Sequence, residues 1–156
     1  MKNYSKILYS IKQCEGCAIT FIVHPNDIGV NKDYILSILE DLKSEYKVEI
    51  QLLDATNIKE KTVIFIEYNK DIDFTKLTEN PNVILMVSRN YHETSNTEII
   101  GSVVKYTSEL IFLLKNKKLQ ILKSRFVQEN DKKLFDINNA VRNFKLKNLE
   151  NESKRD

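Results

Sequence analysis

A continuous apolar run near the N-terminus constrains the fold more than any other feature. Residues 17–23 contain no charged side chain, which is typical of a strand buried on both faces of a parallel sheet. A polar segment, 24–32, follows, and a helix is expected from about Asn31, with Asp27 or Asn31 as its cap. Its apolar positions repeat at helical spacing: Ile35, Ile38, Leu39, Leu42 and Tyr46. This strand–loop–helix unit predicts an α/β fold.

The rest of the chain supplies further strands and few helices. Residues 48–53 alternate like a half-buried strand, while 62–67 and 82–88 are apolar enough for buried strands. Short strands are expected at 110–114 and 119–122 around a turn, and at 134–137 and 141–144 as a final hairpin. Other segments are a helix or strand at 4–13, at most one helical turn at 74–77, irregular chain at 89–97 and a helix at 97–108. We therefore expect a mainly parallel α/β sheet with an antiparallel C-terminal edge.

Size and composition favour one domain. The chain has 156 residues, of which 42% are hydrophobic. This suffices for a single core over residues 1–146, followed by a charged tail, 147–156, expected to be disordered. No stretch approaches the roughly 20 apolar residues of a membrane span, and the N-terminus lacks the apolar core of a signal peptide. We expect a cytoplasmic protein without membrane contact.

Charge and cysteine content leave two questions open. Residues 1–100 carry 11 Lys and Arg against 15 Asp and Glu, whereas 101–156 carry 13 against 7. The basic C-terminal third suits nucleic acid or an acidic partner, but equally a soluble lysine-rich surface. Cys14 and Cys17 form the only Cys-x-x-Cys pair, and no histidine follows at zinc-finger spacing, so packing beside Gly16 is favoured over a metal site.

The three glycines stand in an informative order with several polar residues. Gly16 precedes the first apolar run, Gly29 lies in the polar segment after it, and Gly101 is followed by Ser102. Glu67 closes the strand at 62–67. Further residues in this order are Ser88, Arg89, Lys123 and Arg125.

This order resembles the RecA-like motor domain of bacterial and phage replicative helicases over about residues 14–145. In that family a turn glycine, a phosphate loop, a strand ending in an acid and a strand ending in a polar sensor follow one another. A Gly-Ser segment and a strand bearing Lys-x-Arg complete the set. The resemblance implies a RecA-like P-loop sheet, and it rests on spacing and order rather than on one motif.

The phosphate loop departs from the family pattern G-x-x-x-x-G-K-[S/T]. Its glycines expose backbone N–H groups, its lysine binds phosphates and its hydroxyl binds Mg²⁺. With Gly29 as the second glycine, His24 takes the place of the first. Val30 then takes the lysine's place and Asn31 that of the hydroxyl. Lys32 stands two positions later, about 200° around a helix from the lysine's direction. The candidate nucleotide site is therefore degenerate.

The acidic residues that the resemblance implies are incomplete. Glu67 takes the place of the Mg²⁺-binding acid, with a side chain one methylene longer than the usual aspartate. A solvated carboxylate at a strand end is the alternative role. Only Glu49 and Asp54 lie near the place of the catalytic base, and neither is assigned. We predict no catalytic residue, no metal and no cofactor.

Two groups of residues remain as contact candidates. In ring helicases the Lys-x-Arg strand presents a lysine and an arginine finger to the neighbouring subunit's γ-phosphate, and Lys123 and Arg125 have the matching spacing. An exposed basic strand edge is the alternative. Residues 90–96 fall where helicases carry a DNA-contacting loop, and Arg89, Tyr91 and His92 are the candidates for gripping single-stranded DNA there, although an ordinary polar loop would contain the same residue types.

The leading hypothesis is a catalytically degenerate RecA-like regulator that acts by contact with a replicative helicase or recombinase. Assembly with itself and contact with single-stranded DNA are left open. The first alternative is a weak NTPase that uses Lys32 and Glu67. The second is a non-enzymatic module for single-stranded DNA whose basic C-terminal third follows phosphates.

Overall fold

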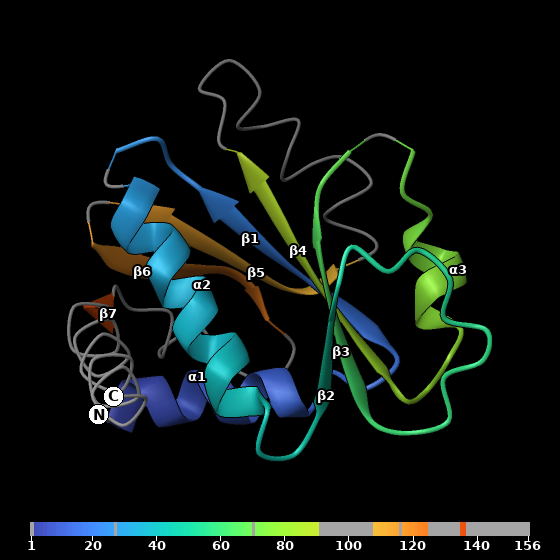
Figure 1. Cartoon of the computed structure of the whole chain (residues 1–156). Coiled ribbons are helices and arrows are strands. Elements are labelled where there is room, and N and C mark those ends of the chain that lie inside the picture. Colours follow the sequence, from blue (N-terminus) through green and yellow to red (C-terminus); the bar gives the residue numbers. More distant parts are fainter. Residues whose placement is uncertain are drawn as a thin grey trace, which may run out of the picture.

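The computed structural model describes residues 2–26, 28–69, 71–90, 108–115, 117–124 and 135–136 (Figure 1). Its elements in chain order are α1 (Lys2–Lys12), β1 (Cys17–Val23), α2 (Ile28–Leu42), β2 (Lys47–Ile50), β3 (Thr62–Glu67), α3 (Phe74–Thr78), β4 (Val83–Asn90), β5 (Ser108–Lys115), β6 (Lys118–Ser124) and β7 (Phe135–Asp136).

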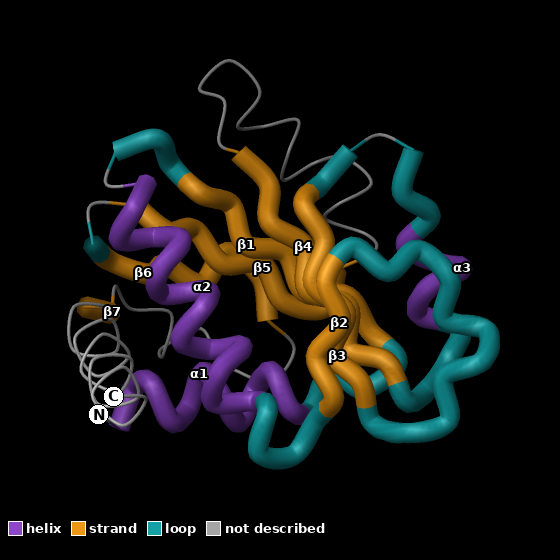
Figure 2. Tube along the Cα trace, viewed as in Figure 1, coloured by secondary structure: helices purple, strands orange, loops and turns teal. Residues whose placement is uncertain are grey.

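The strands form one sheet in the order β2-β3-β4-β1-β5-β6-β7 (Figure 2). The first five strands in this order are parallel, and the β5–β6 and β6–β7 pairs are antiparallel. The expected α/β sheet with an antiparallel C-terminal edge is therefore confirmed. The order differs from 3-2-1-4-5-6 and 2-1-3-4-5, the two common doubly wound arrangements.

β1 lies in the interior of the sheet, as its apolar sequence predicts. It pairs with β4 on one side, where Thr20 is opposite Val87, and with β5 on the other, where Thr20 is opposite Ile111. Six of its seven residues are buried. β3 is the next neighbour beyond β4, so the strands at 17–23, 62–67 and 82–88 lie close together.

Alternate residues of β1 face two separate cores. Ile19 and Phe21 pack with α1 and α2 on one face, where the rings of Phe21 and Phe112 lie 5.2 Å apart. Ala18 belongs to the opposite face, which is covered by α3 through Phe74 and Leu77 (Figure 1). Because both faces of β1 are covered, its side chains need no polar alternation.

Gly16 makes the turn that leads into β1. Its φ of +76° is in the left-handed region that favours glycine. Its N–H donates to the carbonyl of Val83 at 2.7 Å, which fixes the start of β1 against the start of β4. Cys14 is buried in the core and Cys17 packs against that core, in agreement with the expected packing role.

The helix after β1 begins and ends earlier than expected. It covers Ile28–Leu42 rather than the segment from Asn31 to Tyr46. Asn31 is consequently not a cap, because it lies inside the first turn. Tyr46 is buried beyond the helix end, where its hydroxyl donates to Glu15 Oε1 at 3.1 Å. The periodicity could not separate a helical residue from one that packs just after the helix.

Other boundaries also required correction. The segment at 4–13 is the helix α1, and the strand expected at 48–53 ends at Ile50 because Gln51 takes a φ of 56°. β4 continues to Asn90, so the start of the segment predicted as irregular is strand. Asp73 caps α3 by accepting from the N–H of Lys76.

The C-terminal predictions were tested only in part. β5 and β6 form the expected antiparallel pair. Ser108, the expected end of a helix, instead begins β5, and residues 97–107 lie outside the described residues. β7 pairs with β6 at Lys118 and Leu119, while the other half of the expected hairpin, 141–144, and the tail 147–156 are not described. Within the described segments, no helix has the length and apolarity to cross a membrane.

Candidate functional site

The carboxyl ends of the central strands meet beside the start of α2. In open α/β sheets this edge is where ligands bind. A cavity of about 240 Å³ lies here. Its lining residues come from α2, from the end of β3 and from the end of β4: Lys32, Glu67, Tyr68, Ser88, Arg89 and Asn90. We call this cavity the crevice.

Glu67 is held by its backbone at the end of β3. Its N–H donates to Gln51 Oε1 at 2.7 Å, and the next N–H, that of Tyr68, donates to the carbonyl of Ser88 at 2.8 Å. The Glu67 side chain is exposed. The backbone is thus fixed, while the carboxylate remains accessible to a ligand in the crevice.

Arg89 stacks on a neighbouring aromatic ring. Its guanidinium carbon lies 4.1 Å from the centre of the Tyr68 ring, a geometry that is attractive because the ring face is electron-rich. Tyr68 in turn contacts Phe74 edge-on, with ring centres 6.2 Å apart. Arg89 is therefore oriented by the fold as a residue of β4, whereas the sequence predicted irregular chain from residue 89 onward.

Lys32 and Glu67 lie on the same crevice. Lys32 is exposed on α2, one turn after the helix begins, and Glu67 lies across from it on β3. The structure therefore brings together the two residues of the NTPase alternative, with Ser88 and Arg89 beside them.

The residues at the positions that resemble the phosphate loop make their contacts inside the protein. Asn31 is fully buried, and its Nδ2 donates to the carbonyls of His24 at 3.2 Å, Asn26 at 3.1 Å and Leu114 at 3.2 Å. Val30 is half-buried and packs against the core beneath α2. The places of the phosphate-binding lysine and the Mg²⁺-binding hydroxyl are thus occupied by packing residues.

Gly29 lies in the same helical turn without any steric need for glycine. A Cβ at Gly29 would meet no atom within 4 Å. The sequence alone could not show this.

His24 is a buried polar residue, and its structural role could not be predicted from the sequence. Its N–H donates to the carbonyl of Leu114 at 2.9 Å, and its Nδ1 accepts from the N–H of Asn26 at 3.1 Å. The segment after β1 is consequently folded onto β5 and not open around a phosphate.

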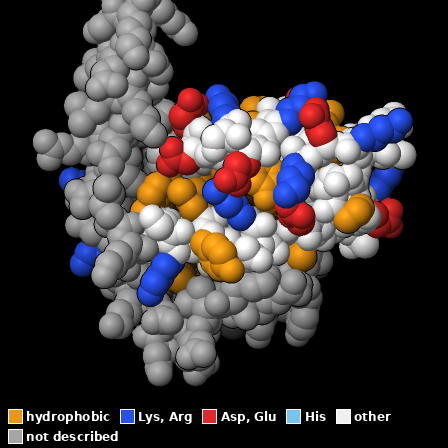
Figure 3. Space-filling view, turned by 90° about the horizontal axis from the view of Figure 1, so that it is seen from below, with side chains coloured by type: hydrophobic (Ala, Val, Ile, Leu, Met, Phe, Trp, Pro, Cys, Tyr) orange, Lys and Arg blue, Asp and Glu red, His pale blue; other side chains and the backbone are white. Residues whose placement is uncertain are grey.

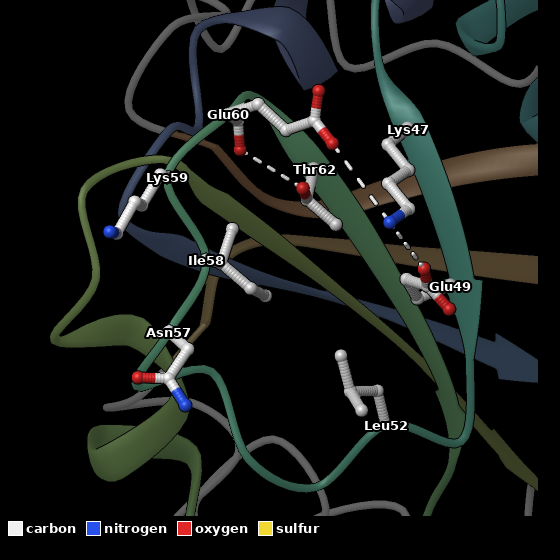
Figure 4. Close-up of a pocket in the computed structure, with 8 residues that line it drawn as sticks. All are labelled: Lys47, Glu49, Leu52, Asn57, Ile58, Lys59, Glu60 and Thr62. Carbon is white, nitrogen blue, oxygen red and sulfur yellow. Dashed lines mark hydrogen bonds and ion pairs between the residues drawn. The ribbon is translucent and has the colours of Figure 1, made fainter.

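The candidates for a catalytic base lie away from the crevice. Glu49 forms an ion pair with Lys47 at 3.2 Å, and Asp54 is exposed in the loop after β2. Hydrogen bonds from the hydroxyl and N–H of Thr56 lower the pKa of Asp54. Glu49 lines a second cavity of about 440 Å³ beside β2 (Figure 4). The crevice thus contains one carboxylate, Glu67, from the residues described around it.

The remaining predicted contacts lie largely outside the described residues. Tyr91, His92 and Arg125 are not described, and Lys123 is described only as a backbone position near the end of β6. On the face seen from below, basic and acidic side chains of the described part are interspersed with hydrophobic ones (Figure 3). The described part of that face shows no single-sign surface of the kind that follows a phosphate backbone.

The donor set suits an anion better than a bound metal. Lys32 and Arg89 place two cationic groups around one carboxylate and one hydroxyl. Among the residues that can be described, no three His, Cys, Asp or Glu side chains gather as a metal site would require. No protein-family model matches the chain, and the curated proteins contain no significant match to it.

Proposed function

We propose that this chain is a degenerate RecA-like protein that regulates a replicative helicase or a recombinase by direct contact and does not hydrolyse nucleotide. The arrangement of β1, β3 and β4, which end together beside the start of α2, supports the proposal. It is the arrangement that a phosphate loop, a Mg²⁺-binding acid and a polar sensor require.

The observation that carries the proposal is the packing of the first turn of α2. Val30 and Asn31 occupy the positions at which a working phosphate loop directs a lysine and a hydroxyl to the nucleotide. Here Val30 packs against the core and Asn31 holds three carbonyl groups inside the fold. A chain that has this strand topology but lacks the phosphate-binding lysine and the Mg²⁺-binding hydroxyl is suited to contact a motor rather than to act as one.

The test is a titration of the full chain into the purified replicative helicase, and separately the recombinase, of the organism that encodes it. We expect a saturable change in the motor's ATPase rate and no hydrolysis by the chain alone. ATP hydrolysis by the chain alone would contradict the proposal. So would unchanged rates together with no binding to either motor.

The crevice favours a second candidate, a weak nucleotide-binding or NTPase activity. Lys32 and Arg89 can neutralise phosphate oxygens there, and Glu67 can hold Mg²⁺. However, 240 Å³ is below the roughly 300–1,000 Å³ of typical ligand pockets, so the crevice suits a phosphate group rather than a whole nucleotide.

Calorimetry with Mg-ATP separates the two candidates. Lys32→Ala removes one of the two cationic groups of the crevice, whereas Lys43→Ala removes an exposed lysine that pairs with Glu40 elsewhere. Low-micromolar binding lost only in Lys32→Ala would favour the second candidate. Absence of binding by the unmodified chain would favour the first. A third candidate, the single-stranded DNA module, requires salt-dependent DNA binding without any motor partner.

A further inference from the structure

The outer edge of β2 is open among the described residues. β2 is the first strand of the sheet order and, among the described strands, pairs with β3 alone. The N–H of Lys47 donates to the carbonyl of Lys61, just before β3, at 3.0 Å, and the N–H of Gln51 donates to the carbonyl of Phe65 in β3 at 2.8 Å. Because backbone groups of successive strand residues point to opposite sides, Val48 and Ile50 direct theirs away from β3. Such an edge is a template for another strand.

Two side chains of opposite charge lie on one face of this edge. Lys47 and Glu49 share one face of β2, with Nζ and Oε1 3.2 Å apart, and Lys47 also lies 3.9 Å from Glu60 (Figure 4). Both side chains are accessible, at 56% for Lys47 and 36% for Glu49. Ile50, at the end of the strand, is 57% exposed although it is apolar.

We propose that two copies of this chain associate through antiparallel pairing of their β2 strands, with Val48 of each copy at the two-fold axis. In this register Lys47 lies directly opposite Glu49 of the second copy, and the symmetry repeats the pair. The exposed Ile50 then lies opposite Tyr46 of the second copy. The dimer joins two sheets into one and goes beyond the proposed function, since it requires neither a motor protein nor a nucleotide.

Charge selects this register over its neighbours. An axis at Lys47 would set two lysines directly opposite each other, and an axis at Glu49 would set two glutamates opposite each other. Like charges in directly opposed positions destabilise a strand pair, while opposite charges stabilise it. Charged residues commonly protect an edge from pairing, but the order of basic and acidic residues at positions 47 and 49 is self-complementary around Val48.

Analytical ultracentrifugation of the full chain over a concentration series tests the dimer, with Lys47→Glu, Glu49→Lys and the double variant. Each single reversal opposes like charges twice, so we expect the dimer to weaken by about tenfold or more. The double variant exchanges the two charges and should restore the dimer. Thermal melting of each variant verifies that the fold is intact.

Amide hydrogen exchange gives a second, independent measurement with an internal control. The amides of Val48 and Ile50 should gain protection as the concentration of the unmodified chain rises, whereas Glu49, whose N–H faces β3, should be protected throughout. A chain that remains monomeric at all concentrations would overturn the proposal. A dimer unaffected by the single reversals, or not restored in the double variant, would equally overturn it.

Discussion

The side-chain nitrogen of Asn31 lies 3.2 Å from the carbonyl oxygen of Leu114 and thereby joins the first turn of α2 to the end of β5. Asn31→Ala removes the donor from three carbonyl groups and leaves a void in the interior. We expect a loss of about 1–3 kcal/mol in the free energy of unfolding. Asn31→Asp should cost more, because it buries a carboxylate against carbonyl oxygens. Urea unfolding measures both, and the exposed Asn57→Ala, expected within about 0.5 kcal/mol of the unmodified chain, is the control.

The two described glycines should respond to alanine in opposite directions. Gly16→Ala forces an alanine into the left-handed region, at a cost of about 1–2 kcal/mol. Gly29→Ala adds a Cβ in open space within a helix, which should stabilise the chain by roughly 0.4–1 kcal/mol. Urea unfolding of the two variants in parallel gives the comparison. Destabilisation by Gly29→Ala would indicate that this turn is not helical as described.

Tyr46 should contribute to a loss of stability at alkaline pH. Burial, followed by the hydrogen bond to the Glu15 carboxylate and nearby negative charge, raises its pKa from 10.0 to about 12. The folded state therefore keeps a proton that the unfolded state releases. The stabilisation is complete below pH 10 and is lost as the pH rises towards 12.

Tyr46→Phe removes this titration, so its free energy of unfolding should fall less steeply over that range. Chemical unfolding at a series of pH values measures the slope. Tyr9→Phe, at a position that is 65% exposed, is the matched control and should keep the slope of the unmodified chain. Equal slopes for Tyr46→Phe and the unmodified chain would contradict the assignment.

Arg125 supplies a prediction for the proposed motor contact. If it acts as a finger towards a partner's nucleotide, Arg125→Ala should weaken the effect on the partner's ATPase rate, with stability changed by no more than about 0.5 kcal/mol. Arg125→Glu should be worse, because it sets a carboxylate against phosphate. Arg142→Ala makes the same charge change elsewhere in the basic C-terminal third. Identical titration curves for all four proteins would remove Arg125 from the contact.

The sequence predicted the strands better than their ends. Uninterrupted apolar runs identify β1, β3 and β4, because a strand covered on both faces needs an apolar side chain at nearly every position. The end of β2 depends on the φ of Gln51, and no residue preference marks a glutamine for the left-handed region. The boundary was therefore expected three residues too late.

The candidate site also has features that the sequence could predict and features that it could not. Glu67 and Ser88 could be placed near one another because each lies towards the carboxyl end of a parallel strand, and these ends share an edge of the sheet. The burial of Asn31 could not be predicted, since its donors are satisfied partly by Leu114, far along the chain. The Arg89–Tyr68 stack was missed for the same reason: it depends on the register between β3 and β4.

The position of β1 in the sheet has a consequence for how the protein is made. Thr20 emerges early from the ribosomal exit tunnel, yet its two strand partners, Val87 and Ile111, are synthesised much later. Until β5 has left the exit tunnel, β1 exposes one unpaired apolar edge. Nascent chains of this protein therefore pass through a long interval in which a chaperone or a neighbouring nascent chain can bind that edge before β5 arrives.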